Sequence, residues 1–247
     1  MQAVLLAGGF GTRLQSVVSD RPKPMAMVDQ HPFLHYLLVQ LKQNGILEIL
    51  FAIGYRGEMI QEYFGSGESY GMHFQYSKEK EALGTAGAIK QAEPFLQDRF
   101  FLLNADTFFQ FSYIQLKNLA ESENFDAVMV LREVEDISRY GQVLLEGNRI
   151  TEFCEPQVKK SHQELGSLDT PRKTGLINGG VYYIKKDLLN MIPAQQKISL
   201  EQEIFPKILE DPQKKIGGLV REGYFMDIGV PHDYFQFVED MKVLNLL

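Results

Sequence analysis

The chain has 247 residues, and its hydrophobic share of 45% and charged share of 23% are ordinary for a globular protein with a substantial core. Its formal net charge of −7 argues against a general nucleic-acid-binding protein, because such proteins hold phosphates through clustered cations. Apolar runs such as Ala3–Ala7 are too short to cross a bilayer, and the single Cys154 fits a reducing compartment, so we expect a cytoplasmic protein without membrane contact.

The first half of the chain alternates short apolar runs with stretches of helical spacing. The runs predict strands at 3–6, 48–53, 73–76, 100–103 and 127–131, and the spacing predicts helices at 32–44, 58–64, 85–92 and 114–122. This alternation is typical of an α/β fold with a mostly parallel sheet and helices on both faces. Ligands of such sheets bind beyond the carboxyl ends of the strands, where residues 8–13 and 104–106 are expected.

The second half is less regular. It predicts strands at 142–145, 149–153, 180–184, 217–221 and 224–227, helices at 200–209 and 233–244, and a polar loop at 157–173. No linker-like stretch separates the halves. We therefore expect a single domain, residues 1–247, with a first lobe at 1–132 and a second at 133–247.

A glycine-rich turn, Gly8-Gly9-Phe10-Gly11-Thr12-Arg13, follows the first predicted strand. Glycines let backbone N–H groups approach an anion closely, although a plain tight turn would show the same residues. Leu14 stands where a Rossmann dinucleotide site needs a small residue, and Thr12-Arg13 stands where a Walker A loop needs lysine followed by serine or threonine. The turn therefore predicts a phosphate-binding loop of neither common kind.

Two cations lie near this turn. Arg13 offers a planar fork of donors that suits a phosphate. Lys23 stands between Pro22 and Pro24, which restrict the backbone on both sides of it. A solvated loop charge is the alternative for Lys23, but its place after the glycine turn favours a ligand role.

Two aspartates each follow a predicted apolar strand. Asp106 ends the stretch Leu102–Asp106, and Asp227 stands in Phe225-Met226-Asp227. Mg²⁺ takes one or two protein carboxylates together with phosphates and water, and two acids with a polyphosphate form a recurrent metal site. Either aspartate alone would also suit a turn or a helix cap.

Seven stretches together carry a family resemblance: LAGGFGTRL, PKPM, LGTAGAIK, LNADTFF, LINGGVYYI, SLEQEIFPK and FMDIGVPHDY. In order and along nearly the whole chain they resemble the sugar-1-phosphate nucleotidyltransferases. Within that family the chain looks most like the short D-glycero-α-D-manno-heptose 1-phosphate guanylyltransferases, and LGTAGAIK is also similar to mannose-1-phosphate guanylyltransferases. The resemblance implies a Rossmann-like three-layer α/β/α nucleotidyltransferase fold.

The implied reaction joins GTP and D-glycero-α-D-manno-heptose 1-phosphate into GDP-heptose and releases pyrophosphate. The alternatives are a mannose-1-phosphate guanylyltransferase, a related uridylyl-, thymidylyl- or cytidylyltransferase, and a regulatory relative that binds a nucleotide sugar without turnover. A dinucleotide-dependent oxidoreductase is disfavoured, because no acid closes the second strand at Ile53-Gly54. Assembly into a homo-oligomer is left open.

The resemblance also implies roles for individual residues. Arg13, Lys23 and Asp106 would be catalytic, and Asp106 and Asp227 would bind Mg²⁺. The sugar phosphate would contact Asn104, Glu155, Asn178 and Gly179. The nucleotide would contact Leu6, Ala7, Gly8, Gly9, Gly11, Thr12, Arg13, Lys23, Glu81, Gly84 and Thr85.

The chain departs from the family pattern at two positions. Ala105 replaces the usual glycine of Asn-Gly-Asp, which would be strained if that position needs a positive φ; we expect the change to be mild. Glu155-Pro156 lacks the intervening lysine that normally meets the sugar's phosphate. The candidates to replace that lysine are Lys159, Lys160 and Lys173.

Overall fold

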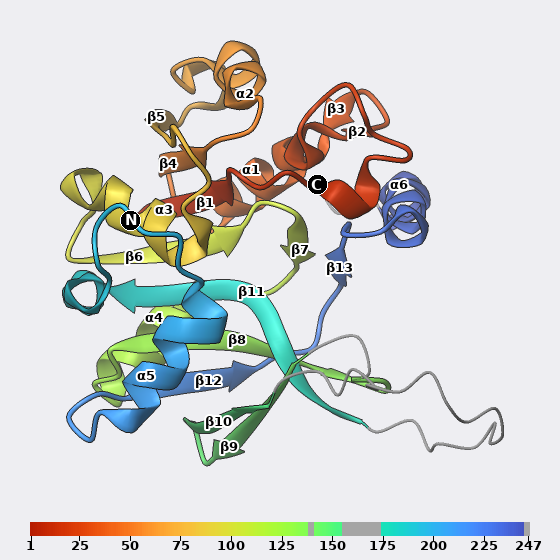
Figure 1. The fold of residues 1–247 in the computed structure, drawn as a ribbon. Coiled ribbons are helices and arrows are strands. Elements are labelled where there is room, and N and C mark those ends of the chain that lie inside the picture. Colours follow the sequence, from red (N-terminus) through yellow and green to blue (C-terminus); the bar gives the residue numbers. More distant parts are fainter. Residues whose placement is uncertain (138–140, 155–173, 245–247) are drawn as a thin grey trace, which may run out of the picture.

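The computed structural model describes residues 1–137, 141–154 and 174–244 (Figure 1). Within these residues a nine-stranded sheet forms the centre of the molecule, in the order β5-β4-β1-β6-β11-β8-β12-β10-β9. In that order the strands are His73–Lys78, Glu48–Ile53, Gln2–Ala7, Arg99–Asn104, Gly175–Lys185, Ala127–Val134, Ile216–Val220, Arg149–Cys154 and Gln142–Glu146.

Most strands of this sheet run in one direction. β5, β4, β1 and β6 pair in parallel, as do β8 and β12. β11 pairs antiparallel with both β6 and β8, and β10 pairs antiparallel with β12 and β9. Because only β11 and β10 oppose the others, the sheet is mostly parallel, as the sequence predicts.

Helices cover both faces of the sheet (Figure 1). Alternate residues of β1 point to opposite faces, so Ala3 and Leu5 belong to one hydrophobic cluster and Val4 to the other. The first cluster takes in α1 (Phe33–Gln43), α2 (Gly57–Phe64), α4 (Ile114–Ser122) and Phe237 of α6 (Pro231–Leu244). The second takes in α3 (Gly84–Ala92), η5 (Lys186–Met191) and α5 (Phe205–Glu210). The three layers confirm the predicted fold class.

Several short elements were not predicted from the sequence. β7 (Thr107–Phe109) forms a separate two-stranded ribbon with β13 (Phe225–Asp227), which lies within the strand predicted at 224–227. β2 (Met27–Val28) and β3 (His31–Pro32) form another ribbon. One-turn helices begin at Thr12 and Lys23.

The predicted helix at 200–209 consists of two pieces, a π-helical turn η6 (Leu200–Ile204) followed by α5. The helices that the structure describes include none long and apolar enough to cross a membrane.

Candidate active site

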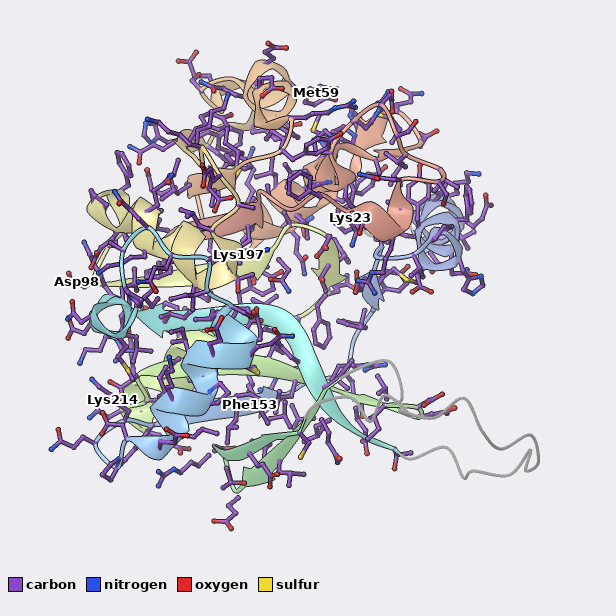
Figure 2. The ribbon with its side chains drawn as sticks, in the orientation of Figure 1. Lys23, Met59, Asp98, Phe153, Lys197 and Lys214 are labelled. Atoms are coloured by element: carbon purple, nitrogen blue, oxygen red, sulfur yellow. The ribbon has the colours of Figure 1, made fainter. Side chains whose placement is uncertain are left out.

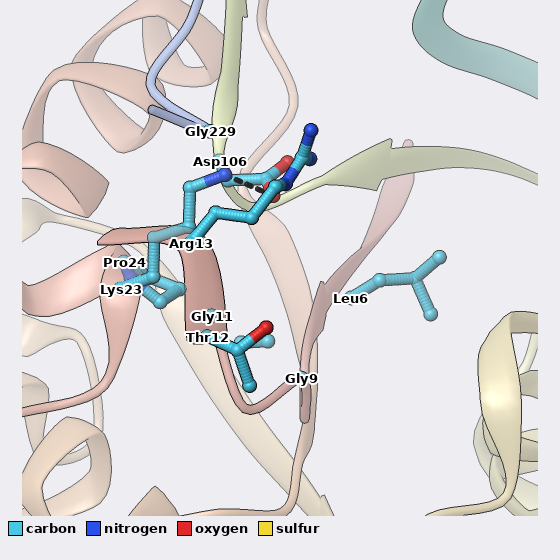
Figure 3. Close-up of a pocket in the computed structure, with 10 residues that line it drawn as sticks. Leu6, Gly9, Gly11, Thr12, Arg13, Lys23, Pro24, Asp106 and Gly229 are labelled. Carbon is cyan, nitrogen blue, oxygen red and sulfur yellow. Dashed lines mark hydrogen bonds and ion pairs between the residues drawn. The ribbon is translucent and has the colours of Figure 1, made fainter. Parts of the chain in front are cut away.

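Two adjoining cavities open at the carboxyl ends of β1 and β6. The first has a volume of about 260 Å³ and the second about 460 Å³, and they share Leu6, Gly9 and Asp106, so they are two parts of one cleft. The first cavity is lined by Leu6, Ala7, Gly9, Gly11, Thr12, Arg13, Lys23, Pro24, Asp106 and Gly229 (Figure 3). The second is lined by Leu6, Gly8, Gly9, Phe10, Ala52, Glu79, Ala82, Gly84, Thr85, Ala88, Asn104, Asp106, Lys197 and Glu201.

The glycine turn follows the carboxyl end of β1, as the sequence predicts, and its residues line both cavities. Gly11 has a φ of +59°, and a Cβ there would lie 2.8 Å from the Cβ of Lys23. Gly9 has open space where a Cβ would be, so a side chain at Gly9 would project without obstruction beside both cavities. The backbone of this turn is therefore accessible to a ligand.

Lys23 is buried at the base of the first cavity. Its Nζ donates to Oδ2 of Asp106 at 2.7 Å (Figure 3). It also donates to Oδ1 of Asp227 at 3.3 Å, and the residue is only 7% exposed. Pro22 is extended and Pro24 stands in the first turn of the short helix that begins at Lys23. The two prolines thus fix the backbone from which Lys23 reaches the carboxylates.

The two aspartates converge although they are far apart in the sequence. β13 pairs with β7 so that Asp227 stands opposite Thr107, and the amide of Ile228 donates to the carbonyl of Asp106 at 3.0 Å. Burial foremost, and then the Asp106 carboxylate, raises the pKa of Asp227, while Lys23 and Arg13 act to lower it. The ribbon therefore holds two carboxylates at short range around one cation.

This carboxylate pair fits a magnesium ion. Among the residues that the structure describes, no three His, Cys, Asp or Glu side chains are grouped so that they could hold a metal. Mg²⁺ needs only one or two carboxylates when phosphates and water complete its coordination. Two half-buried carboxylates at short range repel each other, which favours a cation between them. Lys23 supplies that positive charge in this structure.

Arg13 is exposed and stands beside Asp227. A Cβ on Gly229 would lie 3.1 Å from Nη2 of Arg13 and 3.0 Å from Oδ1 of Asp227. Gly229 thus permits the close approach of the guanidinium and the carboxylate. The structure therefore places the two predicted cations, Arg13 and Lys23, in one cavity with Asp106.

The second cavity contains three charged residues that were not predicted from the sequence, namely Glu79, Lys197 and Glu201. Lys197 is exposed, and it lies near the centre of the view in Figure 2. The neighbouring Ile198 is fixed to α3, because its amide donates to the carbonyl of Leu83 at 2.9 Å and its carbonyl accepts from the amide of Ala86 at 3.0 Å.

Glu79, not the predicted Glu81, lines the second cavity. Glu81 is exposed and belongs to the lining of neither cavity, whereas Glu79 is 9% exposed and burial raises its pKa. Burial alternates here, with Ser77 and Glu79 buried and Lys78 and Lys80 exposed, but all four residues are polar, so the sequence alone carries no signal for it. Gly84 and Thr85, both predicted, line the cavity at the start of α3.

The four predicted sugar-phosphate residues are placed differently from one another. Asn104 lines the second cavity. Asn178 and Gly179 line neither cavity but lie on β11 next to it, where the register shifts between Asn178 and Tyr182. Nδ2 of Asn178 donates to the hydroxyl of Tyr182 at 2.6 Å.

The two departures from the family pattern have different outcomes. The non-glycine residues with positive φ in the described ranges are Asp29, Arg56, Asn124 and Gln195, so Ala105 has an ordinary backbone and is fully buried without that strain. The second departure falls outside the described residues, which include neither Glu155 nor the three lysines proposed in place of the missing one, Lys159, Lys160 and Lys173.

Comparison with known proteins identifies relatives along the whole length. The nucleotidyl transferase family model matches residues 2–243. The D-glycero-alpha-D-manno-heptose 1-phosphate guanylyltransferase of Campylobacter jejuni subsp. jejuni serotype O:2 is 40% identical over 240 residues, which cover 96% of this chain and 99% of that protein. The enzyme of the same name from Aneurinibacillus thermoaerophilus is 38% identical, with 98% and 99% covered.

A solved structure extends this similarity to three dimensions. HddC from Yersinia pseudotuberculosis, crystallised in complex with GMP-PN, superposes with a TM-score of 0.79 at 30% identity. The match covers 97% of this chain and 99% of HddC.

Proposed function

The chain belongs to the nucleotidyl transferase family, and from that premise we propose that it is a D-glycero-α-D-manno-heptose 1-phosphate guanylyltransferase. It would form GDP-heptose and pyrophosphate from GTP and the heptose 1-phosphate. At the site, the proposal rests on one observation: the glycine turn is close to two cations and two carboxylates, namely Arg13, Lys23, Asp106 and Asp227. That combination suits a triphosphate, which needs close backbone donors, cations and a metal site together.

We assign the nucleotide to the first lobe, residues 1–132. The triphosphate would lie over Gly8, Gly9, Gly11 and Thr12, while Leu6, Ala7, Gly84, Thr85 and Glu81 would contact the base and ribose. The positive φ of Gly11 and the open space at Gly9 support this assignment. Glu79 is an added candidate because it lines the same cavity.

Asp106 and Asp227 would hold Mg²⁺. When bound, this ion would neutralise negative charge on the phosphates. Lys23 bridges the same two carboxylates in this structure, so its ammonium is already held at the point where phosphate charge must be balanced. Arg13 would bind a phosphate from the open side of the first cavity.

The reaction needs no general base. A phosphate oxygen of the sugar 1-phosphate is already anionic at neutral pH, and it would attack the α-phosphorus in line. A new P–O bond forms while the bond between the α-phosphorus and the bridging oxygen breaks, and pyrophosphate leaves with that electron pair. Arg13 and Lys23 would hold the two anions together and stabilise charge on the transferring group.

The sugar phosphate would share the second cavity with the base and ribose of the nucleotide. It would contact Asn104, Glu155, Asn178 and Gly179, and we assign it to the second lobe, residues 133–247. Lys197 supplies a cation to that cavity and could meet the sugar's phosphate. We place the reaction in the cytoplasm, as the single Cys154 suggests. Assembly as a homo-oligomer stays a proposal.

The test is a matrix of four nucleoside triphosphates against several sugar 1-phosphates, followed by pyrophosphate release. We expect the highest kcat/KM for GTP with D-glycero-α-D-manno-heptose 1-phosphate. Preference for mannose 1-phosphate would instead support the second candidate, which the LGTAGAIK stretch favours. Nucleotide-sugar binding without pyrophosphate release for any pair would identify a regulatory relative and refute the proposal.

A further inference from the structure

Glu201 lies on the π-helical turn η6 and lines the second cavity together with Asn104 and Asp106. Its carboxylate accepts hydrogen bonds from three hydroxyl groups. The hydroxyls of Thr85 and Ser199 donate to Oε2 at 2.8 Å and 3.1 Å, and that of Tyr182 donates to Oε1 at 3.1 Å. Resting on the proposed function, we propose that Glu201 binds the sugar 1-phosphate by accepting a hydrogen bond from one of its sugar hydroxyls.

The direction of each of these three hydrogen bonds follows from the second partner of the hydroxyl group. Each hydroxyl already accepts from an N–H: Thr85 from the amide of Leu200 at 2.7 Å, Ser199 from the amide of Gln202 at 3.2 Å, and Tyr182 from Nδ2 of Asn178 at 2.6 Å. A hydroxyl has one proton to donate. All three protons are therefore directed to Glu201.

Tyr182 cannot give up its proton readily. Its side chain is fully buried, and burial foremost, followed by the charge of Glu201, raises its pKa well above the usual range. It therefore acts as a neutral donor to Oε1. The buried phenol and the two hydroxyls on Oε2 fix the orientation of the carboxylate.

Glu201 keeps one acceptor position open. A carboxylate has about four lone-pair positions, and the three hydroxyls occupy two on Oε2 and one on Oε1. The remaining position is on Oε1, in a side chain that faces the cavity. Within the described ranges, no lysine or arginine forms an ion pair with Glu201.

The negative charge of the Glu201 carboxylate determines which part of the ligand it can bind. A carboxylate repels a phosphate but accepts strongly from a hydroxyl group. Both the ribose and the acceptor sugar carry hydroxyls. Glu201 belongs to the second lobe and is linked through Tyr182 to Asn178 on β11, a predicted sugar-phosphate residue, which favours the acceptor sugar.

The test is Glu201→Gln, with Glu203→Gln as the matched control. Glu203 stands on the same turn, but it is exposed and its carboxylate accepts from the amide of Ser199 at 2.9 Å. The KM of the sugar 1-phosphate is expected to rise about tenfold to a hundredfold in Glu201→Gln, as for the loss of a hydrogen bond to a charged group. The KM of GTP should stay within about twofold in both variants.

A series of monodeoxy sugar 1-phosphates gives a measurement that would not change if Glu201 had only a structural role. With one of these analogues, the sugar KM of the wild-type enzyme should rise by the same factor that Glu201→Gln shows with the full substrate. With that analogue, Glu201→Gln should show no further rise in KM. An unchanged sugar KM, or a rise in the KM of GTP instead, would overturn the inference while the proposed function stands. Absence of turnover by the wild-type enzyme with every pair would refute the proposed function itself.

Folding of Glu201→Gln is checked by thermal unfolding and by GTP binding. If that variant does not fold, Tyr182→Phe replaces it, because it removes only the hydroxyl that fixes Oε1. A smaller rise in the same KM is then expected. An unchanged sugar KM in Tyr182→Phe would also overturn the inference.

Discussion

Replacing Lys23 with methionine removes the only positive charge that hydrogen-bonds both Asp106 and Asp227 in the part of the chain that the structure describes. Lys23 is 7% exposed, whereas the side chains of Asp106 and Asp227 are 37% and 29% exposed. Breaking a fully buried ion pair costs about 3–5 kcal/mol, and partial exposure of the aspartates places this case at the lower end. We expect Lys23→Met to lower the free energy of unfolding by about 3 kcal/mol.

The assay is denaturant unfolding, with Lys117→Met as the control. Lys117 pairs with Glu121 on the surface of α4 at 3.9 Å, so its loss should change the free energy of unfolding by less than about 0.5 kcal/mol. Adding Asp227→Asn to Lys23→Met removes one of the uncompensated carboxylates and should restore about 1–2 kcal/mol. A midpoint for Lys23→Met equal to that of the wild type would refute the reasoning that Lys23 stabilises this carboxylate pair.

Three further predictions concern the same cleft. Asp106→Asn and Asp227→Asn should each lower Mg²⁺-dependent pyrophosphate release by about a hundredfold or more while the circular dichroism spectrum stays native, and near-wild-type activity would contradict the metal assignment. Lys197→Met should raise the KM of the sugar 1-phosphate about tenfold without changing the KM of GTP, and an equal rise in both would show that its role is not specific to the sugar phosphate. Burial raises the pKa of Glu79, so the ionised form of Glu79 lowers the free energy of unfolding at pH values above the ordinary carboxyl range. Glu79→Gln should therefore be more stable than the wild type at pH 7, and the difference should shrink as the pH falls through the raised pKa. Denaturant unfolding at several pH values measures this difference.

Much of the fold could be predicted because its strands are continuous apolar runs. The strand at 48–53 and the helix at 114–122 were predicted with their observed bounds. The rule that ligands bind at the carboxyl ends of parallel strands also placed the glycine turn next to Asp106. Local pattern and sheet geometry were sufficient for these features.

Other features depend on contacts between distant segments, which leave little signal in a single sequence. β7 has three residues, too few for a period of two to be recognised. The strand predicted at 224–227 was found as β13, but its pairing with β7 was not predicted. Lys197 and Glu201 reach the cleft because Ile198 is hydrogen-bonded to the start of α3. The family resemblance implied Glu81, whereas the structure places the buried Glu79 in the lining of the second cavity.

The ribbon of β7 and β13 has a consequence for how the enzyme matures. Lys23 and Asp227 are 204 positions apart, and the pairing of β13 with β7 brings Asp227 close to Asp106. Contacts of such long range are slow to form during folding. A nascent chain that has not yet emerged from the ribosome beyond residue 224 already contains the glycine turn and Lys23, but it lacks the second acid. We therefore expect such a chain to lack Mg²⁺-dependent turnover until β13 has paired with β7.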